Sequence, residues 1–128
     1  MKNVFITGVA GFLGSHLAKK MSDLGWAVSG NDNFMGSDQS NLPAFVNFHK
    51  IDCCDLDAME KAMKGTNLLF HCAATAHEGL SVFSPTFITK NNYEASIATF
   101  TAAIKCGVKR IVYCSSMARY GNQKTPFT

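Results

Sequence analysis

Short runs of β-branched and aromatic residues alternate along the chain with longer stretches in which apolar residues recur every three or four positions. The short runs predict strands at residues 3–7, 26–32, 45–51, 67–72 and 109–115. The helical spacing predicts helices at residues 11–24, 56–63 and 86–105, and the polar stretches at 33–42, 73–84 and 121–128 have the composition of loops. Strands and helices that alternate in this way predict an α/β fold with a doubly wound parallel sheet. Right-handed crossovers give the strand order 3-2-1-4-5, with a ligand crevice between the first and fourth strands.

The turn between the first predicted strand and the first predicted helix is rich in glycine. Gly8, Gly11 and Gly14 follow the spacing Gly-x-x-Gly-x-x-Gly. Backbone amides converge at such a turn and the helix N-terminus carries about half a positive charge, so the turn suits a phosphate. A tight turn also needs glycine for steric reasons alone. Asp32 favours binding, because it ends the second strand eighteen residues past Gly14, where an acid accepts hydrogen bonds from an adenosine ribose.

Composition narrows the class of protein. The 128 residues suffice for one domain, and 47% hydrophobic and 16% charged residues are ordinary for a soluble globular chain. The net charge of +3 is scattered and no basic run exceeds two residues, so we expect no nucleic-acid partner. No apolar run approaches membrane-spanning length and the first strand begins at once, so we expect neither a membrane span nor a signal peptide.

The cysteines and histidines indicate the cellular compartment and argue against a metal site. The five cysteines are odd in number and form no Cys-x-x-Cys pair, and the four histidines share no helix face at metal-ligand spacing. We therefore expect a reducing, cytoplasmic setting without disulfides, and no metal site. Cys72 and Cys114 lie within apolar runs, where a free cysteine packs as a small hydrophobic side chain.

Several motifs follow one another along the whole chain. They are the glycine-rich segment 7–17, Asp32-Asn33, Asp52, His71-Cys72-Ala73-Ala74, Asn91, Tyr113-Cys114-Ser115-Ser116 and Tyr120-Gly121. In this arrangement the chain resembles the extended short-chain dehydrogenases/reductases, and among them the NAD-dependent epimerase/dehydratase family, with enzymes of the UDP-hexose 4-epimerase type the most similar. The resemblance implies that residues 1–128 form an incomplete NAD-binding Rossmann-like domain, truncated before the catalytic helix and without the substrate domain.

The resemblance also implies which residues contact NAD. The pyrophosphate is held by Gly8, Gly11, Phe12, Leu13 and Gly14, and the adenosine ribose by Asp32 and Asn33. A 2′-phosphate would face the Asp32 carboxylate, and no Arg or Lys lies between residues 31 and 41 to offset it, so NAD is preferred over NADP.

The remaining implied contacts lie further along the chain. Asp52 and Cys53 flank the adenine, although Asp52 also stands where it could begin the cap of the next helix. The wall beside the nicotinamide ribose consists of Cys72, Ala73 and Ala74, and Asn91 fixes the loop after the fourth strand.

Ser116 matches the catalytic serine of the family, which hydrogen-bonds the reacting sugar hydroxyl; a plain turn serine is the alternative. The family's Tyr-x-x-x-Lys pair is matched literally by Tyr120 and Lys124. We do not assign the pair there, because Gly121-Asn122 favours a turn over a helix interior, and we expect the true pair beyond residue 128.

The implied function is the NAD-binding portion of a nucleotide-sugar epimerase, with NAD as cofactor and reversible hydride transfer at the sugar ring. The alternatives are a nucleotide-sugar dehydratase or reductase, or a non-catalytic NAD-binding or sensing module. Without the Tyr-x-x-x-Lys pair, we expect the chain to bind NAD and not to turn over. The helix at 86–105 is predicted to leave part of its apolar face uncovered, with Ile97, Phe100 and Ile104 as candidates, so we expect a homodimer or self-association.

Overall fold

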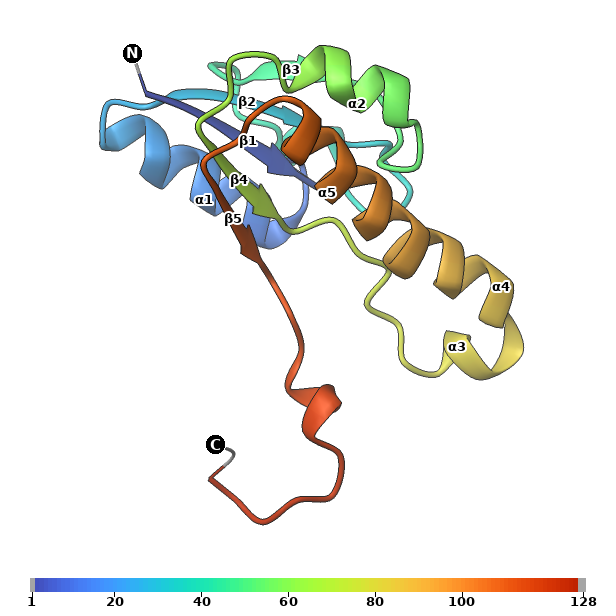
Figure 1. Ribbon diagram of the computed structural model, residues 1–128. Coiled ribbons are helices and arrows are strands. Elements are labelled where there is room, and N and C mark those ends of the chain that lie inside the picture. The colour runs from blue at the N-terminus through green and yellow to red at the C-terminus, as the bar shows by residue number, and fades with distance from the viewer. Residues whose placement is uncertain (1, 127–128) are drawn as a thin grey trace.

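The computed structural model describes residues 2–126, so the last two residues of the predicted terminal loop lie outside the described part. The strands are β1 (Asn3–Thr7), β2 (Ala27–Asn31), β3 (Asn47–His49), β4 (Leu68–His71) and β5 (Arg110–Tyr113). They form one parallel sheet in the order β3-β2-β1-β4-β5, which confirms the predicted order and fold class (Figure 1). β3 is shorter than predicted, because the amide of Val46 donates to the carbonyl of Pro43 in a turn (3.1 Å) and is lost to the ladder.

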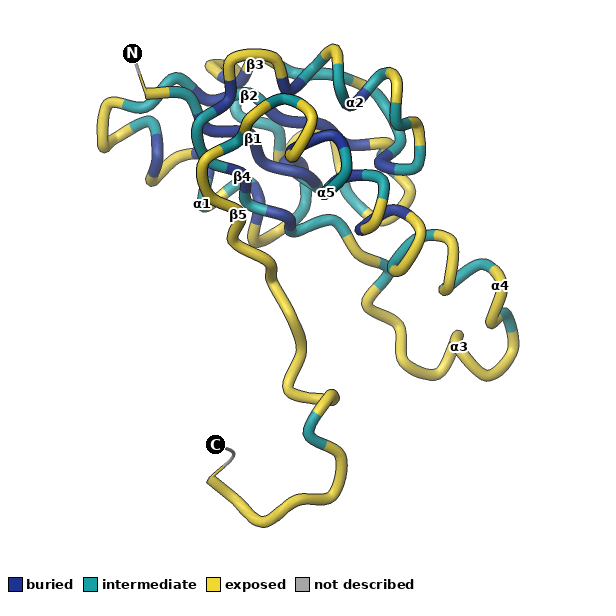
Figure 2. Tube along the Cα trace, in the orientation of Figure 1, coloured by how far each residue is buried: buried dark blue, intermediate teal, exposed yellow. Residues whose placement is uncertain are grey.

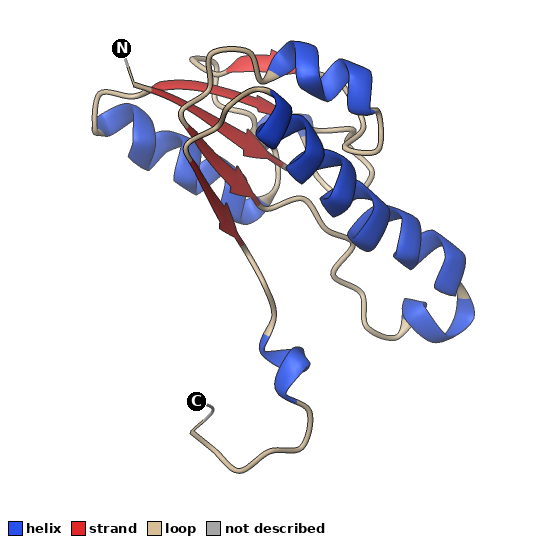
Figure 3. Ribbon diagram, viewed as in Figure 1, coloured by secondary structure: helices blue, strands red, loops and turns tan. Residues whose placement is uncertain are grey.

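Helices cover both faces of the sheet (Figure 3). α1 (Phe12–Asp23) lies on one face, and α2 (Leu56–Ala62) and α5 (Ala95–Lys105) lie on the other. Side chains alternate along β1, so Val4 and Ile6 pack with Ala18 of α1, whereas Phe5 packs with Met59 of α2. The central strand is therefore buried on both faces, as its continuous apolar run predicts.

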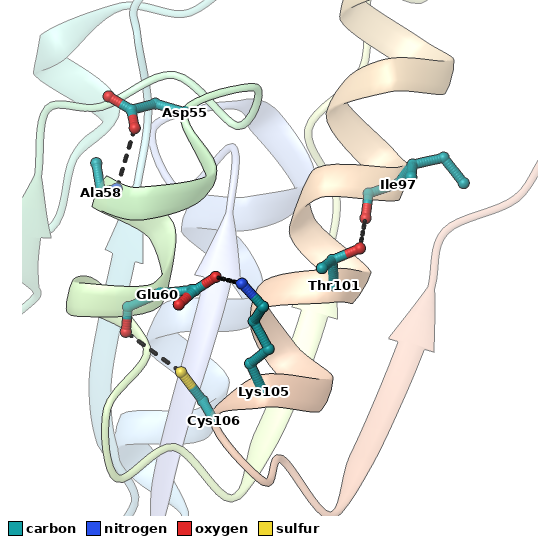
Figure 4. A network of polar contacts seen from close by, with 7 residues as sticks. All are labelled: Asp55, Ala58, Glu60, Ile97, Thr101, Lys105 and Cys106. Atoms are coloured by element: carbon teal, nitrogen blue, oxygen red, sulfur yellow. Dashed lines mark hydrogen bonds and ion pairs between the residues drawn. The ribbon is translucent and has the colours of Figure 1, made fainter.

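The contact between α2 and α5 combines apolar packing with polar links (Figure 4). The Asp55 carboxylate caps α2 by accepting from the amide of Ala58 (3.0 Å). Across the two helices, Lys105 pairs with Glu60, and the Cys106 thiol donates to the carbonyl of Glu60 (3.2 Å). The ion pair is partly exposed and contributes little to stability, so the apolar contacts hold the two helices together.

The helix predicted at 86–105 is a continuous helical run of α4 (Pro85–Ile88), the π-helical segment η2 (Thr89–Glu94) and α5. A π turn uses one residue more than an α turn, so it changes which side chains face the sheet. Ile97 and Ile104 are exposed, at 50% and 74%, as predicted. Phe100, the third candidate, is only half-buried, with its ring edge-on to His71 and Tyr113, so it is more covered than Ile97 and Ile104.

Three short helices complete the described part of the chain. η1 (Gln39–Asn41) and α3 (Leu80–Phe83) lie in segments predicted as loops, and η3 (Met117–Tyr120) follows β5. β5 is the edge of the sheet, and all of its residues are exposed. Residues 114–126 run away from the body of the domain and are exposed except for the half-buried Tyr120 (Figure 2).

Candidate functional site: a cleft at the carboxyl edge of the sheet

A cleft of about 890 Å³ lies at the carboxyl ends of β1, β2, β3 and β4 and extends along the loop that follows β4. In an open α/β sheet this edge is where ligands bind. The predicted site residues that line the cleft are Gly8, Gly11, Asp32, Asn33, Asp52, Cys53, Cys72, Ala73, Ala74 and Asn91. The predicted residues Phe12, Leu13, Gly14 and Ser116 do not line it.

The glycine turn brings β1, α1 and the exit of β4 close together. Gly8 has φ +66°, and a Cβ at this position would lie 3.0 Å from the backbone of Ala73. A Cβ on Gly14 would lie 2.1 Å from the carbonyl oxygen of Gly8. Gly14 therefore lets α1 pack directly beneath the turn and acts there without lining the cleft, whereas Gly8 clears the cleft of any side chain.

The first turn of α1 offers main-chain donors. Gly11 is the N-cap residue, and no side chain caps the helix. The first amides of a helix have no partner within it, so those of α1 are left for a ligand or solvent. Phe12 and Leu13 point their side chains to solvent, at 82% and 48% exposed, and the Phe12 ring packs on His16. What these two residues can give to a ligand is therefore their amides.

Asp32 ties the glycine turn to β2. Asp32 as a residue is 7% exposed. One oxygen of its carboxylate accepts from the amide of Ala10 (3.1 Å), and the other accepts from the amide of Phe34 (2.8 Å) and the hydroxyl of Ser37 (2.7 Å). A carboxylate has about four acceptor positions, so one remains for a ligand hydroxyl. The bracing of the turn is a second role of Asp32 that its position at the strand end does not reveal.

Asn33 and Asp52 form the far side of the cleft. The Asn33 amide donates to Asp52 (2.9 Å), and the amide of Cys54 donates to the other Asp52 oxygen (2.8 Å). Burial raises the pKa of the Asp52 carboxyl, but these hydrogen bonds and the charge of Lys90 outweigh it, so the pKa lies below its ordinary value. The N-cap residue of α2 is Asp55, and Asp52 leads into this cap, because its carbonyl accepts from the amide of Asp55 (3.1 Å).

Cys53 reaches the cleft from the core. Its side chain is 7% exposed, and burial raises the pKa of its thiol. The Asn31 amide donates to the carbonyl of Ile51 (3.0 Å) and contacts the Cys53 sulfur (3.4 Å). The Oδ1 atom of Asn31, a residue that also lines the cleft, is buried without a hydrogen-bond partner in the described structure. Buried polar atoms are nearly always satisfied, so this oxygen has room for a donor from water or a ligand.

The wall formed by Cys72 and Ala73 is held by a buried chain of polar groups. The Thr7 oxygen accepts from the amides of Cys72 and Ala73, both at 3.1 Å, so its own proton is donated to Nδ1 of His71 (2.7 Å). Nε2 of His71 must then carry the ring proton, and it donates to the Ser96 hydroxyl (2.9 Å). This series of hydrogen bonds fixes the tautomer of His71 and the path of the backbone just after the end of β4.

His71 is a core residue, as its position in a predicted strand suggests. The ring stacks on Tyr113, with 5.7 Å between ring centroids. Burial lowers the pKa of His71 to about 4, so the ring is neutral at physiological pH. Neither its site role nor that of Thr7 was predicted, although Thr7 and His71 both stand at strand ends next to the glycine and Cys-Ala-Ala motifs.

The loop after β4 is fixed by the neighbour of the predicted asparagine. Asn92 accepts from the amide of Thr75 (2.7 Å) and donates to the carbonyl of the same residue (3.1 Å). Asn91 lines the cleft but donates to the carbonyl of Phe87 in its own helix (3.0 Å). The predicted role of Asn91 in holding the loop is therefore wrong, because the π-helical segment turns Asn92 toward the loop.

Ser116 lies beyond β5 and outside the cleft. It is exposed, and its hydroxyl accepts from the amide of Ala118 (3.1 Å) as the N-cap of η3. η3 ends at Tyr120, and Gly121 has φ +60°. Tyr120 and Lys124 therefore do not share a helix face, which agrees with leaving the Tyr-x-x-x-Lys pair unassigned there.

Residues 2–126 contain no group of three or more His, Cys, Asp or Glu side chains placed to hold a metal ion. No helix among these residues is long and apolar enough to cross a membrane.

The parallel sheet, the glycine turn at an uncapped helix N-terminus and the acid at the end of β2 define a dinucleotide-binding domain of the Rossmann type. Residues 4–128 match the NAD dependent epimerase/dehydratase family, and the chain belongs to this family.

The relatives are much longer than the chain. UDP-glucose 4-epimerase 3 of Oryza sativa subsp. japonica is 33% identical over an alignment of 138 positions, gaps included, which covers 97% of this chain and 37% of the relative. The structure of UDP-N-acetylglucosamine 4-epimerase from Methanobrevibacter ruminantium, in complex with UDP-N-acetylmuramic acid, matches with a TM-score of 0.91 and 34% identity over 99% of this chain and 42% of that one. UDP-glucose 4-epimerase from Stenotrophomonas maltophila, with bound NAD and formylated UDP-arabinopyranose, matches with a TM-score of 0.93 and 30% identity over 99% and 41%. The chain thus spans about two fifths of the length of these relatives.

Proposed function

We propose that the chain is the NAD-binding portion of a nucleotide-sugar epimerase of the UDP-hexose 4-epimerase type. The observation that carries the proposal is the cleft, which is lined by the N-cap residue Gly11 of the uncapped helix α1 and by the buried carboxylate of Asp32. The likeness to 4-epimerases, one of them with bound NAD, supports both the cofactor and the nucleotide-sugar substrate.

The residues present fit NAD. Gly8 contributes no side chain to the cleft, and the first amides of α1 supply donors and a positive dipole for the diphosphate. Asp32 keeps one acceptor position for a ribose hydroxyl after bracing the turn. Asn33 and Asp52 remain the proposed neighbours of the ribose and adenine, and Cys72 with Ala73 the wall beside the nicotinamide ribose.

The charges of the cleft favour NAD over NADP. Among residues 2–126, no Lys or Arg lines the cleft, whereas Asp32, Asp52 and Glu78 do. A 2′-phosphate on the adenosine ribose would face the Asp32 carboxylate without a compensating cation. The proposal therefore includes selectivity for the cofactor that lacks this phosphate.

The chemistry assigned to the protein is orientation. NAD, when bound, accepts a hydride from the sugar ring and returns it. The Cys72–Ala74 wall and the amides of α1 fix where the cofactor lies, and Ser116 is the proposed hydroxyl partner of the sugar in the longer enzyme. Because Ser116 lies outside the cleft and Tyr120 and Lys124 do not share a helix face, we expect the isolated chain to bind NAD without turnover. Loss of turnover with retained binding is also what a non-catalytic NAD-binding module would show, and a nucleotide-sugar dehydratase or reductase would share the same cleft.

The proposal has two further parts. Ile97 and Ile104 are exposed on one helix and support self-association or a homodimer through α5. The free cysteines of the chain support a cytoplasmic location.

Isothermal titration calorimetry of the chain with NAD and with NADP tests the cofactor assignment without needing catalysis. We expect saturable binding of NAD, and binding of NADP weaker by about tenfold or more, equivalent to at least about 1.4 kcal/mol. The matched control is Gly8→Val, which places a side chain against the backbone of Ala73 and should remove binding. Equal affinity for both nucleotides, or no binding of NAD by a folded chain, would overturn the proposal.

A further inference from the structure

Two thiols lie in contact where β4 and β5 leave the sheet. The sulfur atoms of Cys72 and Cys114 are 3.6 Å apart, and each residue directly follows the last residue of its strand. Neither takes part in a disulfide. Figure 1 shows the two strands side by side with their ends pointing the same way.

The main chain holds these two residues as neighbours independently of their rotamers. His71 and Tyr113 are register partners in the parallel ladder, so Cys72 and Cys114 are the next pair along. The ladder continues to this pair, because the amide of Cys114 donates to the carbonyl of His71 (3.1 Å). Adjacent strands lie about 4.8 Å apart, which falls inside the Cα separation of roughly 4.4–6.8 Å that disulfides require.

Their surroundings differ in a way that suits a two-step reaction. Cys114 is exposed, whereas Cys72 is half-buried in the wall of the cleft. Burial and the nearby Cys114 raise the pKa of the Cys72 thiol to about 12, so Cys72 is protonated at neutral pH. An external disulfide therefore meets Cys114 first, and Cys72 is held next to it as the second thiol.

We propose that Cys72 and Cys114 form a reversible oxidation site, a dithiol that closes to a disulfide by exchange with a small disulfide such as oxidised glutathione. Dithiols of this kind in reducing compartments are typically redox-sensing.

The exchange balances in two steps. The Cys114 thiol releases its proton to solvent and its sulfur attacks one sulfur of oxidised glutathione; a mixed disulfide forms on Cys114, and one glutathione leaves as its thiolate with the electron pair and takes up a proton. The Cys72 thiol then releases its proton to solvent and attacks the Cys114 sulfur, and the second glutathione leaves. The protein loses two electrons and two protons, and oxidised glutathione is reduced to two molecules of glutathione.

The disulfide would couple the wall formed by Cys72 and Ala73 to β5 and the segment that carries Ser116, a consequence that rests on the proposed function. The amide of Cys72 donates to the hydroxyl oxygen of Thr7, which ties Cys72 to β1. In the described structure β5 is an edge strand that pairs with β4 on one side only. Any backbone adjustment that the disulfide needs therefore falls on the Cys114 side, and Ser116 lies two residues further along. Oxidation would reset the position of Ser116 and leave the glycine turn unchanged.

Peptide mapping tests the pair directly, since trypsin places the two cysteines in separate peptides, residues 65–90 and 111–119, and the other three cysteines in neither. The chain is incubated with oxidised glutathione, alkylated, and digested without reduction. We expect one crosslinked species joining these two peptides in most molecules, reversed by dithiothreitol. Cys72→Ser should instead stop at a glutathione adduct on Cys114. Cys106→Ser is the matched control and should crosslink as the unmodified chain does.

Several results would overturn the site. These are a stable glutathione adduct on Cys114 of the unmodified chain, no modification of either cysteine, or a link between Cys114 residues of two chains on a non-reducing gel. The readout is a covalent mass, so it stands whether or not the chain binds NAD, and failure of one proposal is distinguishable from failure of the other.

Discussion

Acidification should destabilise the domain through His71. The ring is buried, its Nδ1 accepts from Thr7 and its Nε2 donates to Ser96, so an added proton would have to replace the Thr7 hydrogen bond. The pKa of His71 falls from an ordinary value of 6.5 to about 4 in the folded chain. Below pH 6.5 the unfolded chain therefore takes up a proton that the folded chain excludes until about pH 4. The contribution of neutral His71 to the free energy of unfolding is therefore largest above pH 6.5, and it falls steadily as the pH drops from 6.5 to about 4.

The size of the effect follows from the two pKa values. At pH 7 the unfolded chain holds little of this proton, and at pH 5 it holds almost all of it while the folded chain holds little. The free energy of unfolding should therefore fall by about 2 kcal/mol between pH 7 and pH 5 on account of His71. Asp52, whose pKa lies below its ordinary value of 3.8, acts only at lower pH and does not enter this interval.

Urea unfolding at pH 7 and pH 5 measures the difference. His71→Asn keeps an acceptor for Thr7 and cannot take up the proton, so its free energy of unfolding should lose about 2 kcal/mol less over the same interval. His77→Asn, at an exposed loop position, is the matched control and should behave as the unmodified chain does. Equal losses in the unmodified chain and His71→Asn would refute the reasoning. If His71→Asn does not fold, an NMR titration of the His71 ring decides, and a ring that is protonated at pH 5 in the folded chain contradicts it.

Three other substitutions test separate parts of the site. Gly14→Ala should lower the free energy of unfolding by about 3 kcal/mol, because its Cβ would lie 2.1 Å from the carbonyl oxygen of Gly8. In the same urea experiment the control Gly36→Ala, whose Cβ would meet nothing within 4 Å, should change the free energy of unfolding by less than about 0.5 kcal/mol. Asn92→Ala removes both hydrogen bonds to Thr75 and should speed hydrogen exchange of the Thr75 amide at least tenfold, which equals about 1.4 kcal/mol in opening free energy. Asn91→Ala should leave this exchange rate unchanged. Faster exchange in Asn91→Ala and not in Asn92→Ala would instead support Asn91 as the residue that holds the loop. Asp32→Asn removes the charge that opposes a 2′-phosphate, so calorimetry should show the NAD-to-NADP affinity ratio falling by about tenfold, and an unchanged ratio would mean that Asp32 does not set selectivity.

The sequence predicts those parts of the fold that depend on patterns of a few neighbouring residues. The apolar run of β1 and the glycines at positions 8 and 14 define the strand, the turn and the helix start within a dozen residues. Right-handed crossovers then leave few orders for five parallel strands, and the observed order is the predicted one.

The parts that were missed depend on helical phase or on contacts between distant segments. The tandem Asn91-Asn92 shows that an asparagine is available, but the π-helical segment decides which of the two reaches the loop. Phe100 was a candidate for the partly uncovered helix face, and the placement of β4 and β5 brings His71 and Tyr113 against its ring. The link between Thr7 and His71 spans 64 residues, and no local pattern signals it.

The central claim is that the amides at the start of α1 hold the diphosphate of NAD, with Asp32 on the adenosine ribose. A crystal structure of the chain with NAD tests this most directly. We expect diphosphate oxygens within hydrogen-bond distance of the amides of Phe12 and Leu13, and a ribose hydroxyl that donates to the remaining acceptor position of Asp32. A nucleotide bound elsewhere, or a glycine turn filled by side chains with Asp32 turned away, would contradict it.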